Sequence, residues 1–165
     1  MVDQDYKKFL ESSKHDIAEI AARHDGEPLK LTAAYFIGCV NASIGPELWK
    51  RVSSYPFSKF QSDFYKKVKD RLQRGGISLG EPIFGWSSDE DEPHPPLEEP
   101  HKKFLEMAVG NLRKIMRSQG DELEKIIGSY YAGCADASAN PQLWKKVESY
   151  RPSSELKREI SARLY

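Results

Sequence analysis

Two cysteines are the residues of this chain best suited to chemistry, and each lies inside a copy of the same phrase. Cys39 belongs to YFIGCVNASIGPELWKRVSSY at residues 35–55, and Cys134 belongs to YYAGCADASANPQLWKKVESY at residues 130–150. Two thiols can form a disulfide when their Cα atoms come within about 7 Å, and a single thiol becomes a nucleophile when its pKa is lowered. The phrase therefore raises the hypothesis of a thiol-redox or small-ligand site. Its members would be Tyr35, Cys39, Tyr130 and Cys134.

The competing interpretation is that both cysteines are small core residues. Each follows a glycine, Gly38 or Gly133, where a bulky side chain would not fit, and cysteine packs as a small hydrophobe. Neither cysteine belongs to a CxxC motif, has a neighbouring histidine or lies at a helix N-terminus that would lower its pKa. We expect packing at these positions and keep the redox or ligand site as the alternative.

The sequence around the cysteines is duplicated at an offset of 95 residues. Residues 7–55 and 102–150 align without a gap and share 20 identities in 49 positions, whereas average composition would give about three. Beyond residue 150 the second copy is shorter than the first. Either copy alone would have a marginal core. We therefore expect two tandem four-helix repeats, the second truncated, packed about a pseudo-two-fold axis into one helical bundle domain.

Apolar residues recur with helical spacing in both copies, and strand-like composition is nearly absent. A first helix is predicted over about residues 4–24, and a second begins at Pro28 or, in the other copy, after Asp121 as N-cap. The third opens at Pro46 or Pro141. The chain is thus predicted to be all-α.

A fourth helix is predicted after Pro56, with one apolar face and one basic face. Its apolar face would consist of Phe57, Phe60, Phe64, Val68 and Leu72, and the shortened counterpart keeps Leu156, Ile160 and Leu164. The basic residues are Lys59, Lys66, Lys67, Lys69, Arg71 and Arg74. They raise a hypothesis of phosphate or nucleic-acid contact, but a solvated face beside an acidic linker is the simpler interpretation.

The second helices carry a small residue at every fourth position. Close approach by another helix is expected there, because small side chains remove the bulk that separates helix axes. The stripes are Ala34, Gly38 and Ala42 in one copy and Ser129, Gly133 and Ala137 in the other. Trp49 and Trp144 follow in the third helices, each beside a leucine, and are expected in the core.

A linker rich in glycine, proline and acidic residues separates the copies. The predicted organisation is repeat 1 over 1–75, linker over 76–100 and repeat 2 over 101–165. Aromatic residues stand beside an acidic run in this linker, a combination that can dock on a partner or on the chain's own domain. The candidate contact residues are Phe84, Trp86, Asp89, Glu90, Asp91 and Glu92.

The composition and the missing motifs narrow the class of function. Lys and Arg number 25, as do Asp and Glu, so bulk charge predicts no attraction to nucleic acid or an anionic membrane. No run approaches the roughly 20 apolar residues of a membrane span, and no signal peptide is recognised, which leaves the cytoplasm, or the nucleus, as the expected compartment. Histidines form no metal motif, and no nucleotide or hydrolase fingerprint is present, so neither a cofactor nor a catalytic residue is predicted.

The sequence therefore predicts a non-enzymatic helical module that binds a protein partner, with the linker as a contact or regulatory segment. The alternative is a helical small-ligand or thiol-redox protein with its site between the repeats. A monomer with internal pseudo-symmetry is favoured.

Overall fold

The structure, a computed structural model, describes residues 4–23, 27–75, 99–148, 160 and 163–164. All regular secondary structure in this part of the chain is helical, which confirms the all-α prediction there. The helices are α1 (Gln4–Ala22), α2 (Glu27–Ile44), α3 (Pro46–Ser53), α4 (Phe57–Arg74), α5 (Glu99–Arg117), α6 (Glu122–Ala139) and α7 (Pro141–Glu148). None of these helices is both long and apolar enough to cross a membrane.

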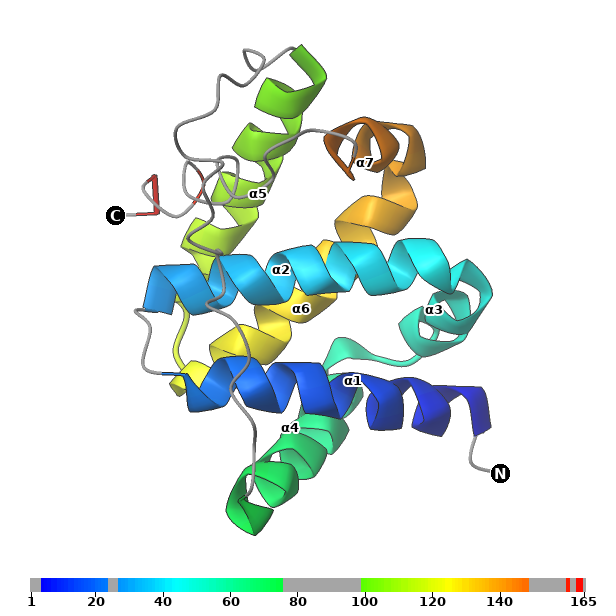
Figure 1. Ribbon diagram of the computed structural model, residues 1–165, viewed down its shortest axis with the longest axis vertical. Coiled ribbons are helices and arrows are strands. Elements are labelled where there is room, and N and C mark those ends of the chain that lie inside the picture. Colours follow the sequence, from blue (N-terminus) through cyan, green and yellow to red (C-terminus); the bar gives the residue numbers. More distant parts are fainter. Residues whose placement is uncertain (1–3, 24–26, 76–98, 149–159, 161–162, 165) are drawn as a thin grey trace, which may run out of the picture.

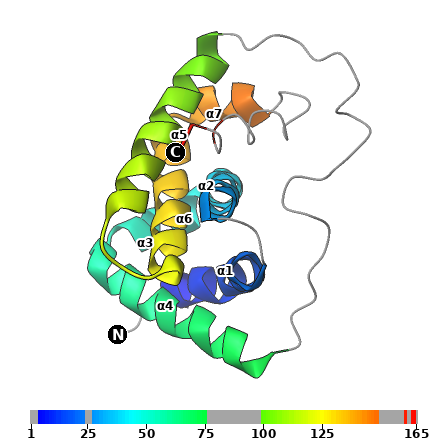
Figure 2. The same ribbon diagram turned by 90° about the vertical axis from the view of Figure 1, so that its left-hand side faces the viewer.

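Helices α2 and α6 cross at the centre of the molecule and share its most extensive helix–helix contact (Figure 1). On one side α1 packs against α3 and α4, and on the other α5 packs against α7. Figure 2 shows α1 with α4 at one end of the molecule and α7 with the start of α5 at the other. Residues distant in sequence therefore meet at one crossing, between helices that belong to different copies of the repeat.

Two glycines explain how closely α2 and α6 approach. A Cβ atom placed on Gly38 would lie 2.1 Å from the backbone oxygen of Tyr130, and one placed on Gly133 would lie 2.0 Å from that of Tyr35. Real Cβ atoms do not come this near, so only glycine fits at either position. The close approach predicted from the small-residue stripes thus occurs, with the two glycines at the contact.

The helix boundaries agree with the sequence to within about two residues. Asp121 caps α6, because its side chain accepts a hydrogen bond from the Glu124 backbone N–H and the Glu124 carboxylate accepts one from the Asp121 N–H. Gly75 ends α4 with a φ of +70°, a conformation that favours glycine. Helix α1 ends at Ala22 rather than near 24, and α5 begins at Glu99, inside the stretch predicted as linker.

Large aromatic residues fill the core on both sides of the α2–α6 crossing. Trp49 and Trp144 are both buried, as predicted, and the fourth-helix residues Phe60 and Phe64 are fully buried. Phe57 was predicted on the same apolar face but is 40 % exposed, because it lies at the first turn of α4, where its ring contacts that of Tyr131 with centroids 4.8 Å apart. Of the shortened fourth helix, Ile160 and Leu164 are buried and Leu156 lies outside the described residues.

Candidate functional site

The four residues of the predicted ligand or redox site all lie at the α2–α6 crossing. Tyr35 and Cys39 come from α2, Tyr130 and Cys134 come from α6, and none of the four has any exposed surface. The chain places them together because each tyrosine is three residues, and each cysteine one residue, from the glycine at the contact. They line none of the three cavities described below.

The buried hydroxyl of Tyr35 is held by a carboxylate of the other copy. Tyr35 Oη donates a hydrogen bond of 2.5 Å to Asp136 Oδ2, which also accepts one of 2.7 Å from Asn111 Nδ2. Burial raises the pKa of Asp136 above its usual value, although both hydrogen bonds act to lower it. Burial is also the main reason why the pKa of Tyr35 is raised, with Cys39 and Asp136 adding to it.

The hydroxyl of Tyr130 has neutral partners. It lies 2.6 Å from Ser13 Oγ and accepts a hydrogen bond of 2.8 Å from Asn41 Nδ2. Burial raises the pKa of Tyr130, and its hydrogen bonds with Asn41 and Ser13 lower it in part. Asn41 stands 95 positions before Asp136, so the equivalent places under the two tyrosines hold an amide and a carboxylate.

Both cysteines are free thiols in the structure, and their surroundings oppose ionisation. Burial, then the neighbouring Cys134 and Asp136, raises the pKa of Cys39 well above its ordinary value. Burial likewise raises the pKa of Cys134, against a hydrogen bond with Tyr130 that lowers it. The thiolate is the reactive form of cysteine, so this geometry favours packing over nucleophilic or redox chemistry.

Two ion pairs that were not predicted from the sequence join α2 to α6. Lys30 Nζ lies 2.7 Å from Glu122 Oε1, and Lys125 Nζ lies 3.4 Å from Glu27 Oε1. Each lysine also donates to the end of a preceding helix, Lys30 to the Ala21 carbonyl and Lys125 to the Met116 carbonyl. The sequence does contain a signal for these pairs, because Glu and Lys recur at equivalent positions of both copies. Their spacing of three residues, however, suggests an ion pair within one helix and not between two helices.

One face of α2 carries a stripe of aliphatic side chains, here called the α2 stripe: Val40 and Ile44, which are exposed, and Ile37, which is partly buried and packs against the core. Val40 is 39 % exposed and Ile44 is 77 % exposed, which makes them two of the few large apolar residues at the surface of the described chain. The equivalent positions of α6 hold only alanines: Ala132, Ala135 and Ala139. Helix α6 thus has small residues at these positions, and packing within the fold does not explain the exposed side chains of Val40 and Ile44.

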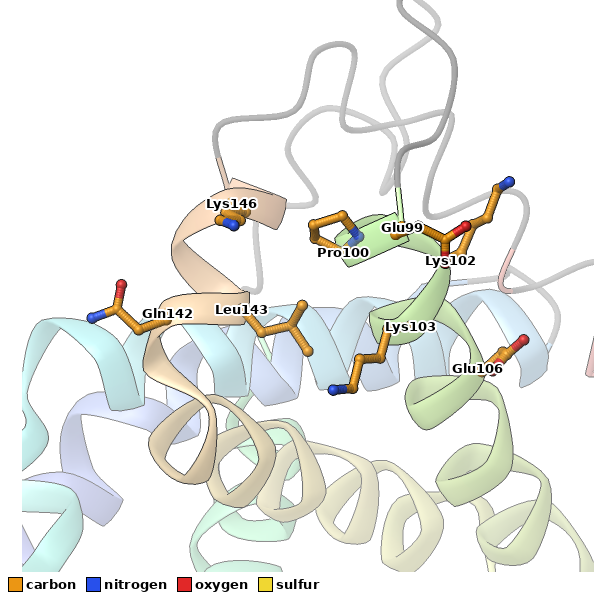
Figure 3. A pocket seen from close by; sticks show the side chains of 8 residues that line it. All are labelled: Glu99, Pro100, Lys102, Lys103, Glu106, Gln142, Leu143 and Lys146. Carbon is orange, nitrogen blue, oxygen red and sulfur yellow. The ribbon is translucent and has the colours of Figure 1, made fainter.

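Three cavities open at the surface of the described residues. A shallow cavity of about 680 Å³ lies between α5 and α7, where Leu143 and Lys103 point into the same gap between the two helices (Figure 3). A second, of about 440 Å³, lies between α1 and α4. A third, of about 230 Å³, lies between the start of α4 and the α5–α6 turn. Lysines line all three cavities.

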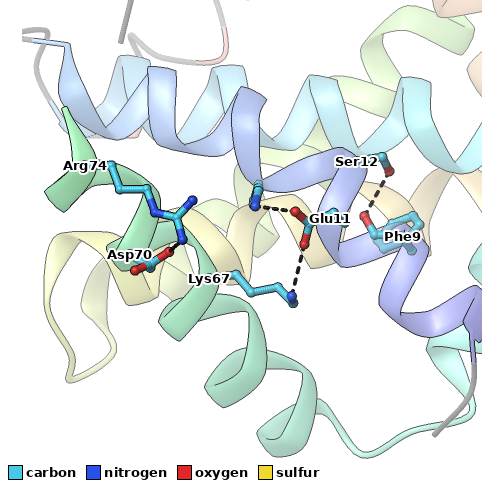
Figure 4. A network of polar contacts seen from close by, with 7 residues as sticks. Phe9, Glu11, Ser12, Lys67, Asp70 and Arg74 are labelled. Carbon is cyan, nitrogen blue, oxygen red and sulfur yellow. Dashed lines mark hydrogen bonds and ion pairs between the residues drawn. The ribbon is translucent and has the colours of Figure 1, made fainter. Parts of the chain in front are cut away.

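Acidic side chains of α1 and α4 hold several of the lysines and arginines nearby (Figure 4). Lys67 Nζ lies 3.1 Å from Glu11 Oε2, and Glu11 also pairs with Lys14. Arg74 pairs with Asp70 at 3.0 Å. The basic face of α4 is therefore partly neutralised within the fold, as expected for a solvated face.

The predicted partner-binding residues, Phe84, Trp86, Asp89, Glu90, Asp91 and Glu92, lie outside the described residues. Among the described side chains, no group of three or more His, Cys, Asp or Glu residues is arranged to hold a metal ion. Comparison of the chain with models of known protein families, with curated proteins and with solved structures gives no match. The function of the chain is therefore inferred from its own surfaces.

Proposed function

We propose that this chain is a non-enzymatic helical protein-interaction module. In this proposal it consists of two tandem four-helix repeats, the second shortened, that pack about a pseudo-two-fold axis into one domain. The α2 stripe is the observation that carries the interaction function. The reciprocal contacts between α2 and α6 support the architecture.

The contacts across the crossing support the pseudo-two-fold arrangement because they are reciprocal. Gly38 faces the Tyr130 backbone, and Gly133, 95 positions later, faces that of Tyr35. A contact of residue i with j that is matched by one of j with i is the mark of a two-fold interface.

Other contacts between the two copies are reciprocal in the same way. The ion pair of Lys30 with Glu122 is matched by that of Lys125 with Glu27. Aromatic pairs follow the same rule: Phe36 with Trp144 has ring centroids 6.1 Å apart, and Tyr131 with Trp49 has them 5.1 Å apart.

The α2 stripe supports a protein partner because exposed aliphatic residues, arranged along one helix face, are what a partner's apolar face would cover. Ile44 leaves most of its surface in water, at a cost that folding does not require, since Ala139 serves at the equivalent position. The partner would present an apolar helix or groove of matching width.

A photo-crosslinking amino acid placed at position 44 or at position 139 tests the proposal in cells that express the protein. Crosslinks to another protein are expected from position 44 and not from position 139, and Ile37→Ala with Val40→Ala should abolish them. Sedimentation of the purified chain then shows whether the partner is a second copy. Equal crosslinking from the two positions, or none from position 44, would contradict the proposal.

The small-ligand or thiol-redox alternative stays a prediction from the sequence. Its four residues are buried and the thiol pKa values are raised, so nothing in the geometry favours it over the interaction module. Thiol titration of the folded chain tests it directly. Reaction of Cys39 or Cys134 before unfolding would revive it.

A further inference from the structure

The charges of this chain are segregated. Residues 76–98 hold six acidic residues and no Lys or Arg, so the remaining residues carry all 25 basic groups against 19 acidic ones, although the whole chain has a net charge of zero. Four of the six acids form the run Asp89–Glu92, three residues after Trp86. A surface with unpaired lysines and an apolar floor would complement this segment in both charge and polarity.

The cavity between α1 and α4 has that composition. Its floor is formed by Tyr6, Leu10 and Tyr55, and the rings of the two tyrosines lie against each other with centroids 4.2 Å apart. Its rim consists of Lys7, Lys59, Lys66 and Lys67, with Asp63 as the one acid that lines it. We call this cavity the α1–α4 groove.

The acids of the α1–α4 groove are already engaged. Asp63 accepts a hydrogen bond of 2.8 Å from Tyr6 Oη and lies 3.2 Å from Lys59 Nζ. Glu11 forms an ion pair with Lys67. Lys7 and Lys66 have no acidic partner among the described residues, so the groove keeps a positive surplus.

The other lysine-lined cavities fit the acidic segment less well. The α5–α7 cavity has Glu99 and Glu106 among its lining residues, which offset its three lysines. At the position of Tyr6 the second copy has His101, so no equivalent tyrosine pair is formed with it. An aromatic floor with surplus lysines is thus a feature of the first copy.

The acidic segment can reach the α1–α4 groove because the chain leaves α4 at Gly75. Lys66 lies nine residues back along this helix, which is about 14 Å at the helical rise. The residues from 76 to 83 span up to about 26 Å when extended. A tethered segment also has an effective concentration in the millimolar range, so weak docking contacts suffice to hold it.

We propose that the α1–α4 groove binds the acidic-aromatic segment 83–92 of the same chain. Phe84 and Trp86 pack on the tyrosine floor, and the acidic run pairs with Lys7, Lys66 and their neighbours on the rim. This proposal goes beyond the proposed function, which rests on the α2 stripe, by naming the surface that the linker occupies. It concerns a different surface from the α2 stripe.

Fluorine NMR of the full chain labelled with 5-fluorotryptophan tests the docking without any partner. The chain has three tryptophans, and Trp86→Phe assigns the resonance of Trp86. In the wild-type chain this resonance is expected away from its position in a free peptide of residues 80–93. Raising the salt from about 0.05 M to about 0.5 M should move it toward that position, because screening weakens the lysine–acid contacts.

Charge reversal at the groove gives the decisive comparison. Lys7→Glu with Lys66→Glu should return the Trp86 resonance to its free-peptide position. Lys102→Glu with Lys103→Glu, the same charge change on the α5–α7 cavity, should leave it displaced. The resonances of Trp49 and Trp144, which are buried, report in each variant that the fold is intact.

Three results would overturn the proposal: a free-peptide position of Trp86 in the wild-type chain, no response to the groove variant, or an equal response to both variants. A response to the α5–α7 variant alone would place the segment in that cavity and also overturn it. Crosslinking from position 44 does not depend on any of these results, so failure here and failure of the proposed function can be told apart.

Discussion

Helices α2 and α6 carry nearly the same residues where they touch each other and different ones where they face outward. At the crossing, glycine, cysteine and tyrosine recur at equivalent positions of both helices. On the outer faces, the aliphatic residues of the α2 stripe stand where α6 has three alanines. The inner face is fixed by a steric requirement that applies to both helices, whereas the outer face has no such requirement and differs between them.

The polar residues under the two buried tyrosines differ as well. Tyr35 donates to a carboxylate, Asp136, and Tyr130 accepts from an amide, Asn41. The group under Tyr35 is therefore a carboxylate that titrates, with a raised pKa, whereas the group under Tyr130 is an amide that does not titrate. Four sets of substitutions test which properties α2 and α6 share at the crossing and which properties differ between them.

The largest effect is expected from Gly38→Ala and Gly133→Ala. Either new methyl group meets a backbone carbonyl at about 2 Å, so the helices must move apart, at a cost of about 3 kcal/mol or more in the free energy of unfolding. Urea denaturation should give similar losses for the two variants. Gly110→Ala is the control, because a Cβ there meets nothing within 4 Å and should stabilise α5 by about 0.5–1 kcal/mol. A large loss at only one of the two crossing glycines would break the equivalence of the halves.

Removal of the two buried hydroxyls comes next. Tyr130→Phe leaves both Ser13 and Asn41 without their partner and should cost about 2 kcal/mol. Tyr35→Phe leaves Asp136 with its hydrogen bond from Asn111, so a smaller loss of about 1 kcal/mol is expected. Chemical denaturation near neutral pH measures both. The reverse order would mean that the carboxylate, not the pair of neutral partners, dominates this network.

Asp136→Asn replaces the carboxylate under Tyr35 by an amide, the group that Asn41 already places under Tyr130. The pKa of Asp136 is raised in the folded chain, mainly by burial, so its contribution to stability is full below the unfolded value of about 3.9 and is lost as the pH rises through the folded value. Asparagine has no such dependence. The variant should therefore gain stability relative to the wild type as the pH rises from about 4 through the raised pKa of Asp136.

The converse substitution, Asn41→Asp, is the matched control for this pH effect. It places a carboxylate under Tyr130 and should introduce a loss of stability as the pH rises. Denaturation of both variants across the same pH range measures the effect. A pH dependence that is unchanged by Asp136→Asn would remove Asp136 from the explanation.

The smallest effect on stability is expected at the α2 stripe. Replacing Ile44 by alanine, the residue that α6 has at this position, removes a side chain that is 77 % exposed and should change the unfolding free energy by less than about 0.5 kcal/mol. Thermal denaturation measures this. A loss above about 1.5 kcal/mol would show that Ile44 packs within the fold, and the stripe would then lose its value as evidence for a partner.

The sequence predicted those parts of the fold that depend on local signals. Helical periodicity, capping residues and the repeat located the helix ends to within about two residues, and the glycines predicted the close crossing. The rotation of each helix about its axis depends on its neighbours, and this is why Phe57 was assigned to the core and why the exposure of Val40 and Ile44 was missed. The repeat did contain a signal for the stripe, the contrast between aliphatic residues and alanines, but its meaning required knowledge of which face points outward.

The candidate site at the crossing illustrates a second limit of sequence reasoning. The sequence left open whether Cys39 and Cys134 lie close together, and hydrogen-bond partners such as Asp136 and Ser13 could not be deduced from spacing. Partners across a helix crossing depend on the crossing angle and on side-chain length. The same limit explains why Glu27 and Lys30 were not recognised as members of ion pairs that link the two copies.

The reciprocal fit of Gly38 and Gly133 also determines how the molecule can come apart. Each glycine allows the backbone of the other helix to approach closely, and Tyr35 and Tyr130 have no exposed surface only while both helices are present. Separation of α2 from α6 would expose both tyrosines and break both ion pairs of the crossing in one event. The chain should therefore unfold in a single cooperative transition, and neither repeat should persist as a folded unit once the other has unfolded.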